Sequence, residues 1–485
     1  MDTNDLFLTE FVDIVKKMEV IPPLSRQGAD RYMKKKTITH LIISIVVGNI
    51  FFAGCVTNNE PALPEQTDAD IAVTLVSDFA NDSFIIPYNT LFNDTLKTQT
   101  TPDQLQLIWN QIEASYGNFT EIISTRTTEE QGYTIVYVTS NYDKLGLLDT
   151  RVVFNGSQQI AGLQFVPTDI SDEYQLPSYT NTENFTEYNV TVGAGTDWPL
   201  PGTLTLPNGD GPFPAIVLVQ GSGPSDRDET IGPNKPFKDL AWGLATEGIA
   251  VLRYEKRTNY YASTLVNMIA NFTVYGETID DARAAVTLLQ TTDKIDQNHI
   301  YVLGHSLGAM LAPRIAQNDS NITGLIMLAA PTRSLTDLIL NQTIYLASLD
   351  GNISEAEQVQ IDSLRENISL ITSHGLGPDE IILGASAAYW YDLNSYNPVV
   401  TALTLHIPML ILQGERDYQV SYTDDFPAWQ QAFAGNASVT LIAYPLLNHL
   451  FIAGNGPPTN TEYNQPGNVD EQVIMDIRNW VDSFL

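Results

Sequence analysis

The segment His299–Gln317 constrains the fold of this chain most strongly. It reads HIYVLGHSLGAMLAPRIAQ, which is typical of an apolar strand, a tight turn and a helix. Further apolar runs lie before this segment at 214–223 and 249–257 and after it at 324–331, and helical patterns such as 280–292 lie between them. Apolar strands that alternate with helices indicate a mostly parallel sheet with helices on both faces. We therefore predict an α/β fold whose active site lies beyond the carboxyl ends of its strands.

The turn in that segment is Gly304-His305-Ser306-Leu307-Gly308, which matches G-x-S-x-G. Small residues flank the serine in this pattern, so that a strained turn can project the hydroxyl and aim the following N–H at the reacting oxygen. The pattern lies directly between a strand and a helix, as this chemistry requires. Ser306 is therefore a candidate nucleophile, and a serine that merely caps a helix is the alternative.

Two partners for Ser306 follow at later strand ends. Asp417 lies in LQGERD after the run MLIL, and His449 lies in LNHLF after the run TLIAYP. The order Ser, Asp, His is that of the α/β-hydrolases. In this arrangement, His449 would accept the Ser306 proton and Asp417 would orient the imidazole. The rivals of Asp417 are Glu415, Asp424 and Asp425.

A glycine-rich loop supplies the fourth part of the candidate site. The run IVLV is followed by Gln220-Gly221-Ser222-Gly223-Pro224, where hydrolases place an oxyanion loop. We predict that the backbone N–H groups of Ser222 and Leu307 hold the oxyanion, with Gly223 as the alternative to Ser222. No G-x-x-x-x-G-K-S/T pattern follows, which argues against a nucleotide site.

Taken together, these segments resemble a known group of enzymes. From about Tyr188 to Leu485 the chain resembles a secreted α/β-hydrolase of the dienelactone-hydrolase or acylaminoacyl-peptidase-like esterase group. The resemblance is carried by QGSGPSDRDETIGPNKPFKDLAWGLATEGIAVLRYEKR, GHSLGAM, LQGERDYQV and NHLF. It implies hydrolysis of small to medium carboxylic esters through a Ser306 acyl-enzyme, without a metal or an organic cofactor. Gln220 departs from the pattern, since many relatives carry His there. A peptidase of the same fold and a catalytically silent surface binding protein remain alternatives.

A helix-prone insertion at about 333–397 interrupts the succession of strands and is expected to form a cap. Its Tyr389, Trp390 and Tyr391 either line a substrate pocket or form the core of the cap. We expect the charged run 226–229 to brace loops near the site through ion pairs.

The catalytic domain, predicted at 188–485, is preceded by a different pattern. Residues 67–167 read as helices followed by four strands, which predicts a small α+β domain. It resembles the uncharacterised domain found ahead of secreted hydrolases, a cone like that of nuclear transport factor 2. It carries no catalytic set, so substrate binding, spacing, dimerisation and a structural role all stay open. Residues 168–187 are expected to form a linker.

The first 66 residues have the pattern of a targeting segment. A basic run at 31–36 precedes the apolar stretch Ile38–Gly54 and Cys55, the only cysteine. Residues 52–55 (FAGC) look like a lipobox, which predicts lipidation of Cys55, a signal at about 33–55 and a tether to residue 66. An uncleaved signal anchor is the alternative, and Met33 competes with Met1 as the start. Sequons of the form N-x-S/T recur along the chain, from Asn81 to Asn436.

Composition limits the partners. Lys and Arg total 24 and Asp and Glu total 57, so the net charge is −33. Nucleic-acid binding depends on clustered basic residues, so we exclude nucleic acid as a partner. The single cysteine excludes a disulfide framework and a cysteine-rich metal site. The sequence thus predicts an exported, glycosylated prokaryotic lipoprotein on the outer face of the cytoplasmic membrane, and the combination of a lipobox with many sequons suits an archaeal one. Its partner is a small ester, and its oligomeric state is left open.

Overall fold

The computed structural model describes residues 67–485, except for 131–132, 145, 169–173, 266–267, 269, 271 and 318. The predicted signal, Cys55 and the tether lie outside the described residues. Within the described part of the chain, no helix combines the length and apolarity needed to span a bilayer.

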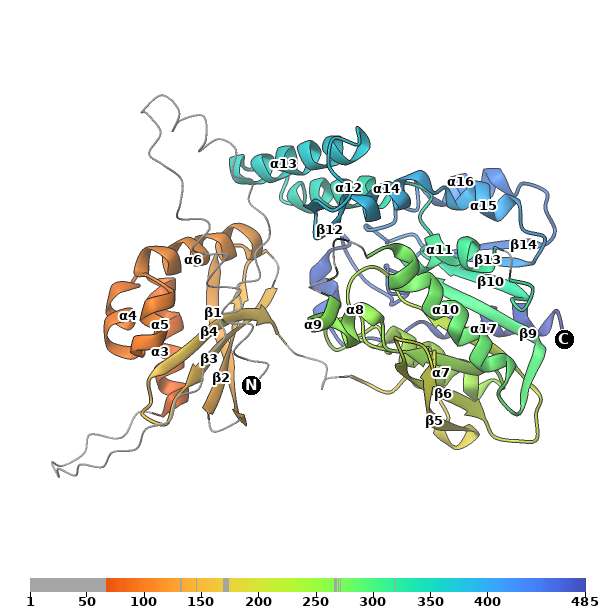
Figure 1. The fold of residues 1–485 in the computed structure, drawn as a ribbon, viewed down its shortest axis with the longest axis horizontal. Coiled ribbons are helices and arrows are strands. Elements are labelled where there is room, and N and C mark those ends of the chain that lie inside the picture. Colours follow the sequence, from red (N-terminus) through yellow and green to blue (C-terminus); the bar gives the residue numbers. More distant parts are fainter. Residues whose placement is uncertain are drawn as a thin grey trace. The chain divides into compact units, whose positions relative to one another are not determined.

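The first domain is built of helices followed by an antiparallel sheet. Thr67 and Thr101 begin helices because their side chains form capping boxes with the first turn. Leu105 and Trp109, which lie four residues apart and so on one helical face, are buried in the domain core. The elements are α3 (Asp68–Ala80), α4 (Ile85–Leu91), α5 (Asp94–Gln99), α6 (Pro102–Tyr116), β1 (Phe119–Glu130), β2 (Tyr133–Tyr142), β3 (Gly146–Phe154) and β4 (Ile160–Pro167), with strand order β1-β2-β3-β4. Figure 1 shows the helices gathered on one side of this sheet, which confirms the small α+β domain.

The second domain contains an eight-stranded sheet in the order β14-β13-β10-β9-β7-β8-β6-β5. The pairs from β8 through β14 are parallel, whereas β5 and β6 add an antiparallel edge. The central strands β10 and β13 are buried along their whole length, which explains their continuous apolar runs. The strands are β5 (Phe185–Val192), β6 (Leu200–Pro207), β7 (Phe213–Val219), β8 (Ala250–Tyr254), β9 (Ile295–His305), β10 (Gly324–Leu328), β13 (Met409–Gly414) and β14 (Val439–Tyr444).

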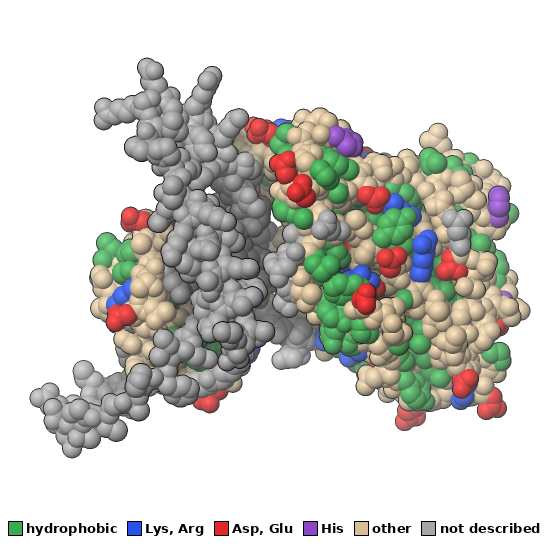
Figure 2. Space-filling view, in the orientation of Figure 1, with side chains coloured by type: hydrophobic (Ala, Val, Ile, Leu, Met, Phe, Trp, Pro, Cys, Tyr) green, Lys and Arg blue, Asp and Glu red, His purple; other side chains and the backbone are tan. Residues whose placement is uncertain are grey.

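Helices cover this sheet, as predicted for an α/β-hydrolase (Figure 1). Helix α10 packs on β9 and β7, α11 on β9 and β10, and α7 on β8 and α17. The framework helices and turns are η3 (Thr182–Asn184), α7 (Pro236–Thr246), α8 (Arg257–Tyr260), α9 (Ala262–Leu265), η5 (Tyr275–Ile279), α10 (Asp280–Gln290), α11 (Leu307–Ala316), α15 (Pro398–Leu403), α16 (Phe426–Ala432), η6 (Asn460–Asn464) and α17 (Glu471–Asp482). On the face in Figure 2, acidic side chains are dispersed among uncharged ones, in keeping with the net charge of −33.

The insertion predicted at 333–397 is helical. It contains α12 (Leu335–Ala347), α13 (Glu355–Thr372) and α14 (Ala387–Ser395), together with the short pair β11 (Ile381–Ile382) and β12 (Ala385–Ser386). Helix α12 contacts both α13 and α14, so that the three helices form one cap.

The boundary predicted between linker and catalytic domain needs correction. The strand β5 begins at Phe185, before the predicted start at 188. Upstream of it, the Tyr174 hydroxyl donates to Asp239 on α7 at 2.7 Å, and the Tyr179 hydroxyl donates to the Val469 carbonyl at 2.8 Å. Tyr174 and Tyr179, which lie in the predicted linker, are thus hydrogen-bonded to the hydrolase domain. The catalytic domain therefore includes the chain from Tyr174 onward.

Candidate active site

Ser306 lies on a strained turn between β9 and α11. Its backbone has φ 54° and ψ −116°, a conformation that non-glycine residues rarely adopt. Close approach of the backbone makes this turn possible. A Cβ on Gly308 would lie 2.2 Å from the Val219 carbonyl oxygen, and a Cβ on Gly304 would lie 2.3 Å from the Gly308 carbonyl carbon. The two glycines of the motif are therefore required by the packing of α11 against β9 and β7.

Asp417 and His449 meet at the ends of β13 and β14. The Nδ1 atom of His449 lies 2.7 Å from Oδ2 of Asp417, and the two residues are 4% and 5% exposed. The other carboxylate oxygen, Oδ1, accepts hydrogen bonds from the N–H groups of Gln419 at 2.8 Å and Val420 at 2.9 Å. Gln413 Nε2 also donates to Oδ2, at 3.2 Å. A carboxylate held in this way orients the imidazole and favours the tautomer with its proton on Nδ1.

The rival carboxylates are engaged elsewhere or exposed. Asp425 is buried and accepts hydrogen bonds from Thr332 N–H and from the Arg333 guanidinium. Asp424 lies 3.5 Å from the same guanidinium, and Glu415 is exposed. Of the four acidic candidates, Asp417 is the one that reaches His449.

His305 connects the turn to the other side of the site. Its Nε2 lies 2.9 Å from the His449 carbonyl oxygen, and the two rings are 4.6 Å apart. Its Nδ1 lies 3.0 Å from Oε2 of Glu229, an ion-pair distance without hydrogen-bond alignment. Burial lowers the pKa of His305, but the Glu229 charge and the His449 carbonyl outweigh it, so the pKa is raised above its ordinary value. His305, the residue before Ser306, thus contacts the loop that carries His449.

The glycine-rich loop predicted to hold the oxyanion directly follows β7. The Gly221 N–H donates to Oε1 of Glu229 at 2.6 Å. Leu307 is the first residue of α11, so that its N–H has no acceptor within the helix. Among the described residues, no acceptor is found for the N–H of Ser222 or Leu307. Both N–H groups are therefore available to a ligand.

Gln220 does not face the site. It is buried, and its Nε2 donates to the Tyr254 carbonyl at 2.5 Å. This contact ties the end of β7 to the end of β8. The departure from the family pattern at Gln220 therefore affects how the loop is supported, and not the lining of the site.

The charged run 226–229 braces loops near the site through ion pairs, as predicted. Arg227 pairs with Glu255 at 2.6 Å, and Asp228 pairs with Arg253.

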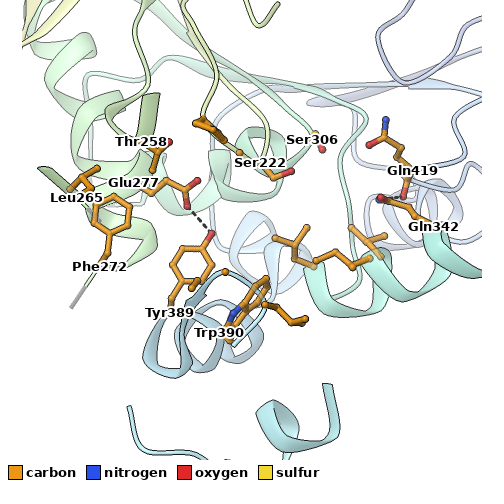
Figure 3. Close-up of a pocket in the computed structure, with 18 of the residues that line it drawn as sticks. Ser222, Thr258, Leu265, Phe272, Glu277, Ser306, Gln342, Tyr389, Trp390 and Gln419 are labelled. Carbon is orange, nitrogen blue, oxygen red and sulfur yellow. Dashed lines mark hydrogen bonds between the residues drawn. The ribbon is translucent and has the colours of Figure 1, made fainter. Parts of the chain in front are cut away.

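A cavity of about 470 Å³ opens in front of Ser306, within the usual size range for small-molecule sites. Figure 3 shows Ser306 and Ser222 near its middle, with Tyr389 and Trp390 on the cap side. Two of the three cap aromatics thus line the cavity, whereas Tyr391 stacks on His374. The wall is mostly apolar, and its apolar residues are Pro224, Ala262, Leu265, Phe272, Leu335, Leu338, Ile339, Leu383, Ala385 and Val420.

The sequence patterns did not single out Glu277 or Lys256, which lie near the cavity. Glu277 lies on the one-turn π-helix η5 and lines the cavity. Its Oε1 lies 2.7 Å from the Nζ atom of Lys256, and its Oε2 accepts a hydrogen bond from Tyr389 at 2.7 Å. An embedded π-turn is often found at a functional site, but its sequence carries no distinctive pattern.

Comparison with known proteins agrees with this geometry. The chain is 39% identical over 414 residues to the esterase EstD of Thermotoga maritima, which covers 84% of this chain and 94% of that protein. The chain belongs to the esterase EstD family of α/β-hydrolases. The family described as "Serine aminopeptidase, S33" matches residues 234–453, and the "Protein of unknown function (DUF3887)" family matches residues 72–163. This confirms the predicted α/β-hydrolase preceded by a small domain of unknown role, in a hydrolase of the esterase type.

Solved structures of lower similarity share only parts of the chain. Est1E from Butyrivibrio proteoclasticus is 16% identical, with a TM-score of 0.37, covering 61% of this chain and 96% of that chain. A puromycin-hydrolyzing peptidase from Mycobacterium tuberculosis is 12% identical, with a TM-score of 0.41, covering 75% of this chain and 48% of that chain.

Proposed function

We propose that this chain is a serine carboxylesterase in which Ser306 is the nucleophile, His449 the general base and acid, and Asp417 the residue that orients His449. The observation that carries this proposal is the buried contact of 2.7 Å between Asp417 and His449, together with the strained turn at Ser306, whose neighbour His305 contacts the His449 carbonyl. Membership of the esterase family supports it independently.

The proposed chemistry proceeds in two steps. Ser306 Oγ attacks the ester carbonyl carbon while Nε2 of His449 takes the hydroxyl proton. The N–H groups of Ser222 and Leu307 hold the oxyanion, which collapses as the alcohol leaves with the proton from His449. Water, activated by the same imidazole, then attacks the acyl-enzyme and releases the acid. Each preorganised oxyanion donor contributes roughly 3–4 kcal/mol to lowering the barrier.

The cavity favours an apolar acyl group of small to medium size. Leu335, Leu338 and Ile339 of α12 line it together with Trp390 of α14. Burying a methylene group against such side chains contributes about 0.8 kcal/mol. Affinity should therefore rise with acyl length until the cavity is filled.

An aminopeptidase would need an acceptor for the substrate's α-ammonium group. Among the described residues that line the cavity, Glu277 is the one with a carboxylate. Its charge is matched by Lys256 at 2.7 Å, and Tyr389 occupies its second oxygen. A free negative charge is thus absent from this part of the cavity, which favours ester over aminopeptide substrates.

The experiment is hydrolysis of p-nitrophenyl esters from C2 to C12 by residues 56–485 and by the Ser306→Ala variant. Leucine 4-nitroanilide is assayed beside them. The proposal expects ester turnover that peaks at an intermediate acyl length and is lost in the variant. Turnover of the anilide alone would support the peptidase, and ligand binding without any turnover would support a silent binder.

We further propose that the protein is exported and held at the membrane by a lipid on Cys55. The lipobox-like sequence FAGC and the preceding apolar stretch support this. Expression of the full chain and of Cys55→Ala in a bacterial host tests it. Esterase activity should sediment with membranes for the full chain and shift to the soluble fraction for the variant. Equal sedimentation of both proteins would contradict lipidation and support a retained signal anchor.

A further inference from the structure

A buried lysine lies directly behind the oxyanion loop. Lys256 follows β8 and is 2% exposed, although lysine is almost never fully buried without a partner. Its Nζ donates to the Gly221 carbonyl at 2.7 Å and lies 2.7 Å from Oε1 of Glu277. Burying an ammonium group in this way is costly unless its contacts compensate. The position of Lys256 therefore calls for an explanation beyond packing.

The carbonyl that Lys256 contacts belongs to the same peptide group as the Ser222 N–H. A trans peptide is planar, so its C=O and N–H point in opposite directions. Fixing the Gly221 carbonyl against Lys256 therefore fixes the direction of the Ser222 N–H. A positive charge on the carbonyl also polarises the peptide group, which makes the N–H a stronger donor.

The preceding peptide group is held from the other side. The Gly221 N–H donates to Oε1 of Glu229 at 2.6 Å, while the Gly221 carbonyl accepts from Lys256. Two buried side chains of opposite charge thus hold the one residue before Ser222. Space is also restricted here, because a Cβ on Gly221 would lie 3.1 Å from Glu229 and 3.2 Å from the Ser306 Cβ.

The charge of Lys256 is balanced from the cavity side. Glu277 is 6% exposed and lies on η5, where it contacts Lys256 through one oxygen and the Tyr389 hydroxyl through the other. Figure 3 shows Glu277 and Tyr389 joined by this hydrogen bond where they line the cavity. Glu277 therefore supplies a counter-charge that holds the ammonium group in place from the cavity side.

We propose that Lys256 is a positioning residue that aims the Ser222 N–H at the oxyanion, with Glu277 as its counter-charge. This inference rests on the proposed function, because it assigns a role within the same site. It predicts an effect on the transition state rather than on substrate binding. Acylation and deacylation both pass through an oxyanion, so kcat falls whichever step limits turnover.

The test compares Lys256→Met with the parent enzyme and with Lys238→Met, which lies on α7 and does not line the cavity. For p-nitrophenyl butyrate, we expect kcat of Lys256→Met to fall on the order of 10²-fold, with KM within about threefold. A trifluoromethyl ketone, which binds as a tetrahedral adduct, should lose affinity by a similar factor to kcat/KM. Lys238→Met should behave like the parent.

Lys256→Met also leaves Glu277 as an unpaired buried carboxylate, which could distort the site or prevent folding. The double variant Lys256→Met/Glu277→Gln removes that charge, and its kcat should stay low if the Gly221 carbonyl must be held. Recovery of the parent kcat in the double variant would overturn the inference, as would a parent-like kcat in folded Lys256→Met. These outcomes differ from failure of the proposed function, in which the parent and Ser306→Ala would hydrolyse esters equally or not at all.

Discussion

Replacement of Asp417 by Asn tests the geometry of the candidate site most directly. Oδ1 of Asp417 accepts two backbone hydrogen bonds, from Gln419 at 2.8 Å and Val420 at 2.9 Å. The amide oxygen of an asparagine must take this position, because an NH₂ group cannot accept either bond. Its NH₂ group then faces His449 Nδ1, which must give up its proton and accept. The proton moves to Nε2, where His449 can no longer act as the base for Ser306.

The expected loss is large for such a small change. A wrong imidazole tautomer in a serine–histidine–aspartate site lowers kcat by roughly 10⁴-fold, the magnitude known from the serine proteases. At 1.36 kcal/mol for each factor of ten, this corresponds to about 5 kcal/mol of barrier. Gln413 Nε2, which donates to Oδ2 at 3.2 Å, would also lose this acceptor, because it would face the new NH₂ group. KM should change little, because Asp417 does not line the cavity.

The assay is steady-state hydrolysis of p-nitrophenyl butyrate, with thermal unfolding to establish that the variant is folded. Asp424→Asn is the matched control, because this carboxylate lies in the same loop region but is largely exposed and lies 3.5 Å from Arg333 rather than beside His449. It should keep kcat within about twofold of the parent. A folded Asp417→Asn enzyme with kcat within tenfold of the parent would refute the assigned role of Asp417.

Three further predictions concern the turn and the cavity. Gly308→Ala should lower the free energy of unfolding by at least about 1–3 kcal/mol in urea titrations, because its Cβ would lie 2.2 Å from backbone; unchanged stability would contradict the close approach. The pKa of His305 is raised, so its contribution to stability is full below about pH 6.5 and is lost as the pH rises through the folded pKa. Urea titrations from pH 6 to 9 should show this decline in the parent and a flatter profile in His305→Gln, and parallel profiles would argue against it. Leu338→Trp should lower kcat/KM for the octanoate ester about tenfold and spare the acetate ester, and an equal loss for both would remove Leu338 from the acyl pocket.

The small domain shows where sequence patterns suffice. Its long helices and four strands were predictable because capping residues, apolar periodicity and turn glycines act within a few residues of one another. The helices α4 and α5 were not predicted, since they have only seven and six residues and carry no long apolar stripe. The anchoring of Tyr174 and Tyr179 was also missed, because their partners lie 65 and 290 residues away along the chain.

For the candidate site, the sequence by itself determined the strands and helices that carry it and the order of the candidate serine, aspartate and histidine along the chain. The strand, the turn around Ser306 and the helix follow from local sterics and periodicity, and the later strand ends limit the acid and the base to a few residues. The position after a strand end already favoured Asp417 over Asp425, and the folded chain brings Asp417 to His449 and Asp425 to Arg333. Tertiary structure alone decided the burial of Lys256 beside Glu277. Charged residues carry no periodic signal, and whether they are solvated or buried depends on contacts between strands and helices distant in sequence.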